Sequence, residues 1–319
     1  MNLKNSLKQA KVRYAEALGS ILLVALFVLP FLSFASHQNK IYVNINNSGT
    51  EDGSKDHPYK TIGEALKHSN KNTEVHISKG TYEENNEIPE GVEIYGSGRD
   101  EVFVKGGDDK PVFTMKNKTK IVGLTAEKGS VGVKIEEGDA ATIVDCIIRE
   151  NDSDGIRIDK SNVNEDNKMI ISDSDISNNG RNGINSERRK IVITNNLISK
   201  NDKDGIFLER GTNAWLSGNA IKNNDGSGMK LELDGSQIFT KSNLYSENHR
   251  EGIEVNSFGA TGRIDIAQSK FRYNGRWGIA RVQRVSAPAS IWNGLTVQLP
   301  NVPMFGNKSG NISSIIRIF

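Results

Sequence analysis

The chain of 319 residues contains one cysteine, seven prolines and few aromatic residues, which make up 7% of the sequence. The lone cysteine, Cys146, excludes an intrachain disulfide framework and a zinc site built on cysteines. A net charge of +2 excludes a strong overall field that would recruit nucleic acid. The scarcity of proline leaves long stretches free to form strands. Only 36% of the residues are hydrophobic, yet isoleucine recurs at regular intervals, which is not typical of a disordered chain.

Basic residues precede a long apolar run at the N-terminus. Residues 1–16 carry four Lys and Arg side chains, and residues 17–36 read ALGSILLVALFVLPFLSFAS. A run of about 20 apolar residues can span a bilayer as a helix, and its basic flank predicts that everything after Ser36 is exported. The length of the run favours an uncleaved membrane anchor. Small residues near Ala35 leave cleavage of a secretory signal as the alternative.

Residues 37–110 read as a short N-terminal module with several strands and one helix. The segment Thr61–His68 places Ile62, Ala65 and Leu66 on one face at helical spacing. Short segments such as EVHI and GVEI predict the strands. An open edge of a stacked β structure would pair with another chain unless it were covered. We therefore predict that the short helix caps the first layer.

A repeat begins after this module and dominates the rest of the chain. An asparagine followed four residues later by glycine and then by an apolar residue occurs six times, starting at Asn151, Asn179, Asn201, Asn224, Asn248 and Asn274. Successive glycines of this pattern are 22 to 28 residues apart. This period, rich in β-branched residues, predicts a coil of three short strands. The lack of a helix-forming stretch in each repeat argues against a leucine-rich repeat.

Stacked coils place equivalent residues above one another, about 4.8 Å apart. We expect the isoleucine columns to fill the interior. We expect the asparagine column, and a second polar column that begins at Cys146 and ends at Ser269, to hydrogen-bond from coil to coil. The glycine column is expected to adopt a backbone conformation that other residues avoid.

These features resemble the pectate-lyase-like superfamily of right-handed parallel β-helix proteins. The resemblance rests on HPYKTIGEAL at residues 57–66, on GTY at residues 80–82, and on repeats that end in DGIRI or DGIFL. It implies an all-β fold, a right-handed parallel β-helix, over most of the exported chain. We expect its repeats in residues 111–285 and an irregular C-terminal cap in residues 286–319, where the repeat loses its phase.

Enzymes of this superfamily offer few matching motifs. Polygalacturonases carry an Asn-Thr-Asp, a pair of aspartates, a Gly-His-Gly and an Arg-Ile-Lys. Only NDSDG at residues 151–155 is loosely similar to the first, which nominates Asp154 as a catalytic carboxylate. The other motifs are absent from the sequence, as is the calcium-ligand cluster with a catalytic arginine of pectate lyases. The resemblance therefore predicts the fold and leaves open whether the protein is an enzyme.

Three glutamates, Glu187, Glu209 and Glu232, occupy the same outward position in successive coils. Like charges directly opposite one another destabilise a sheet. The presence of three stacked carboxylates therefore needs an explanation. Screening by neighbouring Lys and Arg is the structural explanation. The functional explanation is a groove for a glycan or a cation, with Glu209 and Glu232 as candidate catalytic residues and Glu187 as a substrate-binding residue.

A second row leads into the same strands. Asp225 and His249 each follow the asparagine of their coil, and a histidine beside an acidic row could raise the pKa of one carboxyl so that it donates a proton. They join Asp154 as catalytic candidates, although exposed turn carboxylates more often serve only solubility. The remaining candidate substrate-binding residues are Phe207, Lys230, Glu254 and Trp277.

Two functions compete at this point. The first is an exported, membrane-anchored β-helix that binds or processes cell-surface or extracellular polysaccharide, neutral or cationic because an acidic row repels a polyuronate. The alternative is a non-catalytic surface rod or adhesin-like module for protein–protein contact, which the regular coil lengths favour. An enzyme would be a polysaccharide hydrolase or lyase. No cofactor, metal or nucleic-acid partner is expected, and calcium at the acidic rows is a candidate without a motif.

Overall fold

The computed structural model describes residues 39–107, 109–161, 167–258, 261–282, 295–299 and 302–313. The chain divides into two compact units, Met1–Gln38 and Asn39–Phe319, and every described residue belongs to the second. The basic segment and the membrane span predicted for residues 1–36 lie outside the described residues. Within the described ranges, no helix is long and apolar enough to cross a bilayer.

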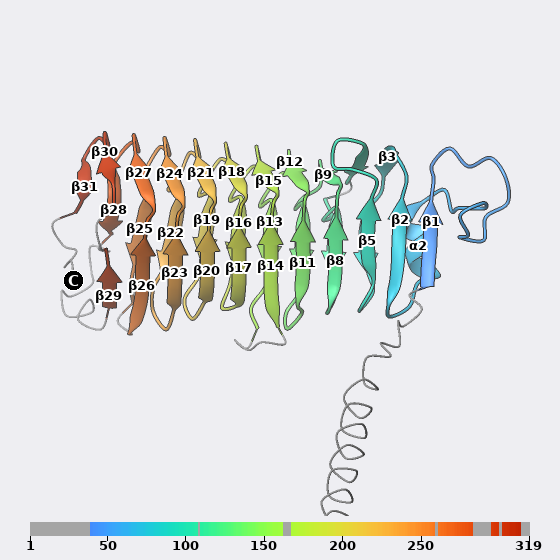
Figure 1. Ribbon diagram of the computed structural model, residues 1–319, viewed down its shortest axis with the longest axis horizontal. Helices are drawn as coiled ribbons and strands as arrows, with labels where there is room; N and C mark the ends of the chain where they lie inside the picture. Colours follow the sequence, from blue (N-terminus) through green and yellow to red (C-terminus); the bar gives the residue numbers. More distant parts are fainter. Residues whose placement is uncertain are drawn as a thin grey trace, which may run out of the picture. The chain divides into compact units, whose positions relative to one another are not determined.

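The described chain forms three parallel sheets of 11, 10 and 10 strands (Figure 1). The first sheet contains β1 (Asn39–Val43), β2 (Thr73–Ile77), β5 (Glu93–Gly96), β8 (Thr119–Val122), β11 (Ala141–Val144), β14 (Lys168–Ser172), β17 (Lys190–Thr194), β20 (Asn213–Ser217), β23 (Gln237–Lys241), β26 (Gly262–Ala267) and β29 (Leu295–Gln298). The second contains β3 (Gly80–Glu83), β6 (Val102–Lys105), β9 (Thr125–Glu127), β12 (Ile147–Arg149), β15 (Asp175–Ser177), β18 (Leu197–Ser199), β21 (Ala220–Lys222), β24 (Leu244–Ser246), β27 (Lys270–Arg272) and β30 (Met304–Phe305). The third contains β4 (Asn86–Ile88), β7 (Phe113–Met115), β10 (Val133–Ile135), β13 (Ile156–Ile158), β16 (Ile184–Ser186), β19 (Ile206–Leu208), β22 (Met229–Glu232), β25 (Ile253–Asn256), β28 (Trp277–Arg281) and β31 (Gly310–Ile312).

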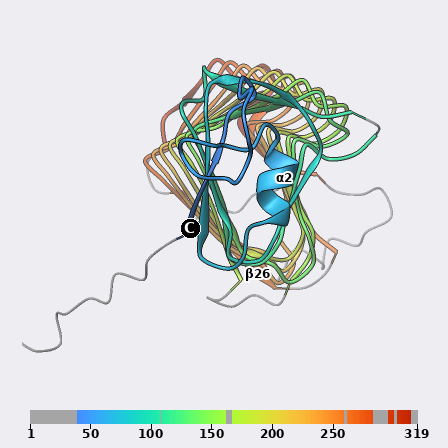
Figure 2. The same ribbon diagram turned by 90° about the vertical axis from the view of Figure 1, so that its right-hand side faces the viewer.

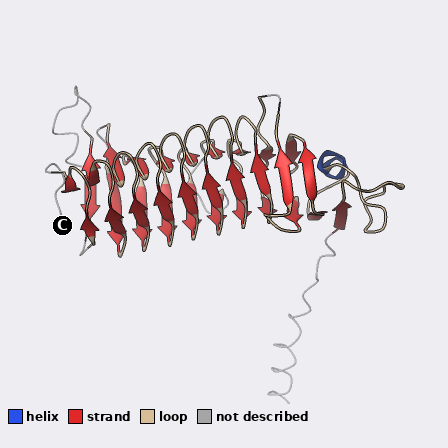
Figure 3. Cartoon of the chain, turned by 90° about the horizontal axis from the view of Figure 1, so that it is seen from above, coloured by secondary structure: helices blue, strands red, loops and turns tan. Residues whose placement is uncertain are grey.

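Each coil contributes one strand to each sheet in turn and then begins the next coil. The strand β17 is followed by β18 in the second sheet, by β19 in the third, and by β20 back in the first. Strands of successive coils pair in parallel, with Lys190 opposite Asn213 and Ile198 opposite Ile221. Seen from above, the coils follow one another along a single axis (Figure 3). The predicted parallel β-helix with three strands per coil is confirmed.

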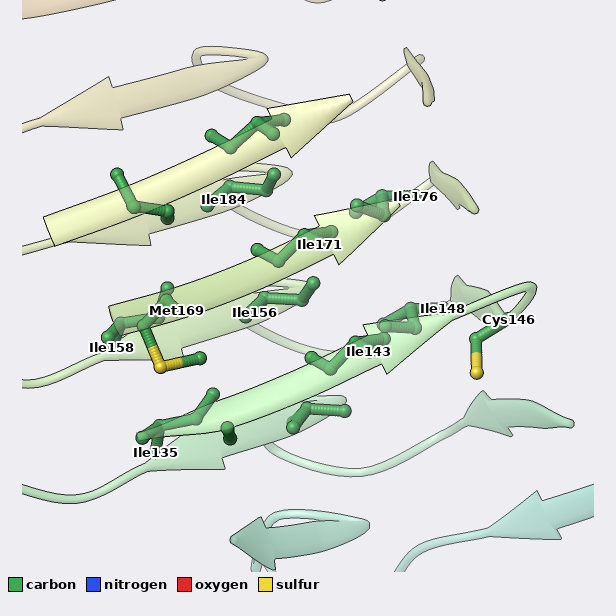
Figure 4. Close-up of a cluster of buried hydrophobic side chains, with 14 of the residues drawn as sticks. Ile135, Ile143, Cys146, Ile148, Ile156, Ile158, Met169, Ile171, Ile176 and Ile184 are labelled. Carbon is green, nitrogen blue, oxygen red and sulfur yellow. The ribbon is translucent and has the colours of Figure 1, made fainter. Parts of the chain in front are cut away.

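The interior is a set of apolar columns, one on the inner face of each sheet. In the second sheet Ile148, Ile176, Ile198 and Ile221 lie in register and are fully buried. Figure 4 shows how isoleucines from several coils fill the space between the sheets. In the next coil, the aromatic ring of Tyr245 continues the column that these isoleucines begin.

Asparagine ladders hold two of the corners, as predicted. Each asparagine of the first ladder donates from Nδ2 to Oδ1 of the next at 2.8–3.1 Å, in the order Asn151, Asn179, Asn201, Asn224, Asn248, Asn274 and Asn307. The second ladder includes the same bond from Asn196 to Asn219, at 3.0 Å. Both ladders are buried, so they satisfy polar backbone groups that the interior would otherwise leave unpaired.

The glycine that recurs in each coil is required for a different reason from the one predicted. Gly205 has no positive φ; instead, a Cβ atom there would lie 2.7 Å from the carbonyl oxygen of Gly228 in the next coil. The close approach of the coils, and not backbone conformation, requires glycine. Left-handed backbone occurs one residue before each of the first six ladder asparagines, at Glu150, Asn178, Lys200, Asn223, Glu247 and Tyr273, with φ between 54° and 57°.

The helix α2 (Ile62–Lys67) occupies the segment in which the sequence predicts one. The hydroxyl of Thr61 accepts a hydrogen bond from the Glu64 amide at 3.1 Å and caps the helix. Ile62, Ala65 and Leu66 are buried, and the helix contacts β1, β2 and β4. In the view along the coils, α2 lies within the outline of the stacked coils (Figure 2). These contacts fit the capping role.

The C-terminal region departs from the prediction. Its described strands β29, β30 and β31 pair in parallel with β26, β27 and β28, so they extend the β-helix by another coil. Asn307 adds a rung to the asparagine ladder, 33 residues after Asn274. An irregular cap is therefore the wrong description of these strands. The apolar residues expected to cover the last coil, Ile315 to Phe319, lie outside the described residues.

Candidate functional site

A row of carboxylates follows the outer edge of the third sheet. Ser186 pairs with Leu208, and Leu208 with Leu231, so the residues that follow them stack in the same register. Those residues are Glu187, Glu209 and Glu232, one per coil. All three are half-buried. The predicted vertical row is therefore present.

The row extends further than the sequence analysis recognised. Asp159 and Glu136 occupy the equivalent position in the two preceding coils, since Ile158 pairs with Ile135. Lys134 Nζ lies 3.7 Å from the Asp159 carboxylate and 3.9 Å from that of Glu136. By contrast, Glu187, Glu209 and Glu232 make no ion pair with any residue that the structure describes. The last three carboxylates of the row thus have no direct ion-pair partner among the described residues.

An open cleft of about 640 Å³ lies beside this part of the row. It is lined by Lys160, Glu187, Arg188, Glu209, Arg210, Gly211, Asp234, Gly235 and Phe258. The lining therefore balances three cationic side chains against three carboxylates. The exposed ring of Phe258, 40% accessible, adds an apolar surface.

The charge of Glu209 is unfavourable in this setting. Burial, followed by the negative charges of Glu187 and Glu232, raises the pKa of Glu209 from 4.5 to about 7. The guanidinium of Arg210 opposes the rise without cancelling it. Near neutral pH the Glu209 carboxyl therefore exists in both protonation states, and it can donate or accept a proton.

Contacts within the cleft hold its aromatic side chain in place. The Asp234 carboxylate accepts a hydrogen bond from the Phe258 amide at 2.7 Å and another from the Ser257 hydroxyl at 3.1 Å. Cζ of Arg210 lies 5.1 Å from the centroid of the Phe258 ring, in cation–π contact. Phe258 thus comes from a loop that is tied to the neighbouring coil.

Phe207 and Lys230 lie next to the acidic row, on the outer face of the third sheet. The Lys230 Nζ is 5.1 Å from the centroid of the Phe207 ring. Both side chains are half-buried and pair in register between β19 and β22. Neither lines the cleft, so of the predicted substrate-binding residues only Glu187 does.

Asp225 and His249 lie at the other end of the third-sheet strands. Their amides donate to ladder carbonyls at 3.0 and 2.8 Å, which fixes them in the turn between the second and third sheets, and both side chains are exposed. The strand β22 separates Asp225 from Glu232. The structure therefore does not bring Asp225 and His249 into the cleft that Glu209 lines.

Two predicted site residues are buried. Asp154, fully inaccessible, pairs with Arg157 at 2.8 Å and accepts from the Asn182 amide side chain at 3.0 Å. Glu254, 3% accessible, pairs with Arg250 at 3.2 Å. The expectation that they face solvent is wrong, because an arginine of the same coil covers each carboxylate: Arg157 covers Asp154, and Arg250 covers Glu254. Trp277, half-buried at the start of β28, lies against Gly310.

A buried acidic cluster that the sequence analysis missed surrounds Ser227. The Ser227 hydroxyl lies 2.9 Å from the Glu254 carboxylate and 3.3 Å from that of Glu251. Burial raises the pKa of Glu251 and of Asp204, and the charge of Glu254 raises both further. Arg250 and Arg276 partly neutralise the cluster. Since these carboxyls are nearly inaccessible, they fit a structural role in the coil stack.

Metal binding finds little support in this geometry. Within the parts of the chain that the structure describes, no group of three or more His, Cys, Asp or Glu side chains is arranged to hold a metal ion. The acidic row runs along the coil axis, so its carboxylates succeed one another instead of converging on one point. Calcium at the row stays a prediction without a ligand cluster.

Comparison with known families now defines the class of protein. The family described as "Right handed beta helix region" matches residues 131–290, half of the 319-residue chain, and the protein therefore belongs to it. Residues 45–107 match a second family, described as a protein of unknown function (DUF1565). No curated protein matches the sequence.

Solved structures with similar folds include a pectate lyase and a bacteriophage tailspike protein. Pectate lyase Pel9A is 11% identical, with a TM-score of 0.60, and the match covers 86% of this chain and 82% of the lyase. Full-length tailspike protein 2 from an Escherichia coli O157:H7 bacteriophage is 12% identical, with a TM-score of 0.64, over 86% of this chain and 41% of the tailspike. At these identities the likeness shows the fold alone.

Proposed function

We propose that this β-helix protein binds a polysaccharide in the cleft that Glu187, Glu209 and Phe258 line. The observation that carries the proposal is the position of Glu209, a carboxyl with a pKa of about 7, in an open cleft beside an exposed aromatic ring. Concave sites with an apolar surface and a few placed polar groups are typical of ligand binding. A fold neighbour named as a pectate lyase supports a polysaccharide as the ligand class.

The charge balance of the lining favours a neutral polysaccharide. Three cationic and three acidic side chains line the cleft, and Glu209 is partly protonated near neutral pH. A polyanion would meet Glu187 and Asp234, and a polycation would meet Arg188 and Arg210. A neutral sugar hydroxyl can accept from a guanidinium and donate to a carboxylate without either repulsion.

The same site offers the groups that glycoside hydrolysis would need. Neighbouring coils stack about 4.8 Å apart, so Glu187 and Glu232 flank Glu209 at about the separation that retaining glycosidases use, about 5–5.5 Å. Glu209 would then serve as the proton donor because its pKa is raised. Binding is the function proposed, and hydrolysis is measured in the same experiment.

A glycan array probed with the purified protein tests this proposal. We expect retention of a neutral polysaccharide by the wild type and loss of retention in Glu209→Gln and Phe258→Ala. Phe305→Ala serves as the matched control, because Phe305 is also exposed (47%) but lies at the end of the second sheet. Reducing-end assays on the retained glycan report cleavage. The absence of any retained glycan at low salt would reject the proposal.

We also propose that the protein is exported and stays attached to the membrane through residues 17–36. The proposal rests on the apolar run and its basic flank. Fractionation of producing cells, followed by protease treatment of intact cells or spheroplasts, tests it. We expect the full-length chain in the membrane fraction, with the β-helix accessible to protease. A shortened, freely soluble chain would instead indicate cleavage near Ala35.

A rod for protein contact is a second candidate function, favoured by one surface. Ile170, Val192, Trp215 and Phe239 follow one another on the outer face of the first sheet. Trp215 is 48% exposed and stacks on Phe239 with ring centroids 4.2 Å apart. An apolar stripe on an otherwise polar face is typical of a contact surface. If this alternative holds, the wild type self-associates in sedimentation experiments and Trp215→Ser does not. Neither protein then retains a glycan on the array.

A further inference from the structure

The N-terminal region contains a ladder of aromatic rings that the proposed polysaccharide cleft does not use. Tyr42 pairs with His76, and His76 with Tyr95, on the outer face of β1, β2 and β5. The ring centroids are 5.4 Å apart in both steps, with interplanar angles of 24° and 17°. All three rings are half-buried. They lie within or next to residues 45–107, the part that matches a family of unknown function.

Ion pairs on the neighbouring column fix the ladder. The Glu74 carboxylate lies 2.9 Å from His76 Nε2 and 3.3 Å from Lys40 Nζ. On the next strand, Glu93 bonds to the Tyr95 hydroxyl and lies 3.6 Å from Lys120, whose Nζ is 3.0 Å from the same hydroxyl. Both carboxylates are therefore compensated, and the rings are held in one orientation.

A cavity of about 360 Å³ opens over this ladder. Its lining consists of Tyr42, Asn44, Lys55, Pro58, His76, Ile77, Ser78, Tyr95, Gly96 and Ser97. The loop that carries Lys55 and Pro58 is tied to β1: the Tyr42 amide donates to the Gly53 carbonyl at 2.9 Å, and the Tyr59 amide donates to the Tyr42 carbonyl at 2.9 Å. The loop is thus a fixed wall beside the first ring.

The lining selects for a hydroxylated, anionic ligand. His76 covers one face of the Tyr42 ring, and the parallel bridge between Val43 and Tyr59 places the buried Pro58 beside Tyr42 on its other side, so the cavity lies over the outer edge of this aromatic ladder. Asn44, Ser78 and Ser97 supply small polar groups along the floor. Lys55 is the one lysine or arginine of the lining, no carboxylate lines the cavity, and among the described residues Lys55 has no ion pair.

From this arrangement we infer a second binding site, for an acidic sugar such as a uronate residue, in the cavity between the Tyr42 ring and the Lys55 loop. The sugar ring lies over the outer edge of the aromatic ladder beside Tyr42, its hydroxyls bond to the asparagine and serine groups, and its carboxylate pairs with Lys55. The site goes beyond the proposed function, because it lies in a different part of the coil stack and prefers a different charge from the neutral cleft at Glu209.

Isothermal titration of the full-length protein with trigalacturonate tests this site. We expect saturable binding that falls about fivefold or more in Lys55→Ala and in Tyr42→Ala. Lys60→Ala, an exposed lysine of the same loop outside this cavity, should bind like the wild type. A neutral galactose trimer should bind at least about fivefold more weakly than trigalacturonate.

Several results would overturn the inference. It fails if no saturable heat appears up to about 10 mM trigalacturonate, or if Lys55→Ala and Lys60→Ala weaken binding equally. Lys55 is exposed, so loss of folding does not complicate that variant; the circular dichroism melt of Tyr42→Ala checks the other. Phe258→Ala should leave trigalacturonate binding unchanged, which separates failure of this site from failure of the cleft. Loss of binding in Phe258→Ala would place the acidic sugar in the cleft instead.

Discussion

The raised pKa of Glu209 predicts how protein stability changes with pH. Burial and the charges of Glu187 and Glu232 raise this pKa from 4.5 to about 7 in the folded state. The folded chain therefore holds this proton more tightly than the unfolded chain does. Its contribution to stability is fully present below about pH 4.5 and is lost as the pH rises through about 7. Substitution of glutamine, which does not titrate, removes this dependence.

The size of the effect follows from the same shift. At about 1.36 kcal/mol for each pH unit, a rise from 4.5 to about 7 is equivalent to about 3 kcal/mol before solvent screening is considered. Glu209 is only half-buried at the edge of an open cleft, and solvent screens such interactions. We therefore expect the wild type to lose about 1–2 kcal/mol relative to Glu209→Gln between about pH 5 and 8.

Urea unfolding followed by far-ultraviolet circular dichroism measures this difference. Wild type, Glu209→Gln and Glu247→Gln are compared at about pH 5, 6.5 and 8. Glu247 is the matched control, an exposed glutamate outside the row, and its variant should keep the wild-type pH profile. If the profile of Glu209→Gln ran parallel to that of the wild type across this range, the reasoning about the acidic row would be refuted.

Three further predictions concern the coil stack. Ile198→Asp should abolish the folded state, because burying an unpaired charge at this inaccessible position costs several kcal/mol; a soluble variant with a cooperative melt would contradict it. Asn201→Ala should cost about 3–6 kcal/mol in urea unfolding, because Asn201 bonds to both neighbouring rungs, whereas Asn213→Ala, an outward position on β20, should cost less than about 0.5 kcal/mol. Gly205→Ala should cost about 1–3 kcal/mol through its clash with the next coil, and equal melting temperatures for this variant and wild type would exclude that clash.

The fold was predictable because one repeated pattern determines it. Ile198 and Asn201 recur in phase with their counterparts in other coils, and a period of 22 to 28 residues allows few other arrangements. The last coil escaped notice because Asn307 follows Asn274 after 33 residues, a longer interval than any in the repeat. An asparagine can therefore belong to the ladder even where its spacing in the sequence departs from the repeat.

The acidic row was predictable, whereas the cleft beside it was not. Glu187, Glu209 and Glu232 share one position in the repeat, so their alignment follows from the pattern. Phe258 belongs to a loop of irregular length, and Asp234 binds its amide where the loop lies beside the row. Contacts of this kind depend on loop geometry, which periodicity does not encode.

Burial of the polar candidates was the least predictable feature. Alternation along a strand places Glu254 outward, yet Arg250 and Ser227 cover it. Asp154 lies in a turn, and Arg157 pairs with it three residues later. Alternation gives the direction of a side chain and says nothing about which neighbours close over it.

The most direct test of the polysaccharide cleft is to locate a bound sugar by nuclear magnetic resonance. The neutral glycan selected on the array is titrated into protein labelled in the phenylalanine rings and the glutamate carboxyl carbons. We predict saturable shifts of the Phe258 ring and of the Glu209 carboxyl, with unchanged signals from Phe305 and Glu247. Shifts confined to Phe239 on the first sheet, or no saturable shift at Phe258, would contradict the assignment of the cleft as the binding site.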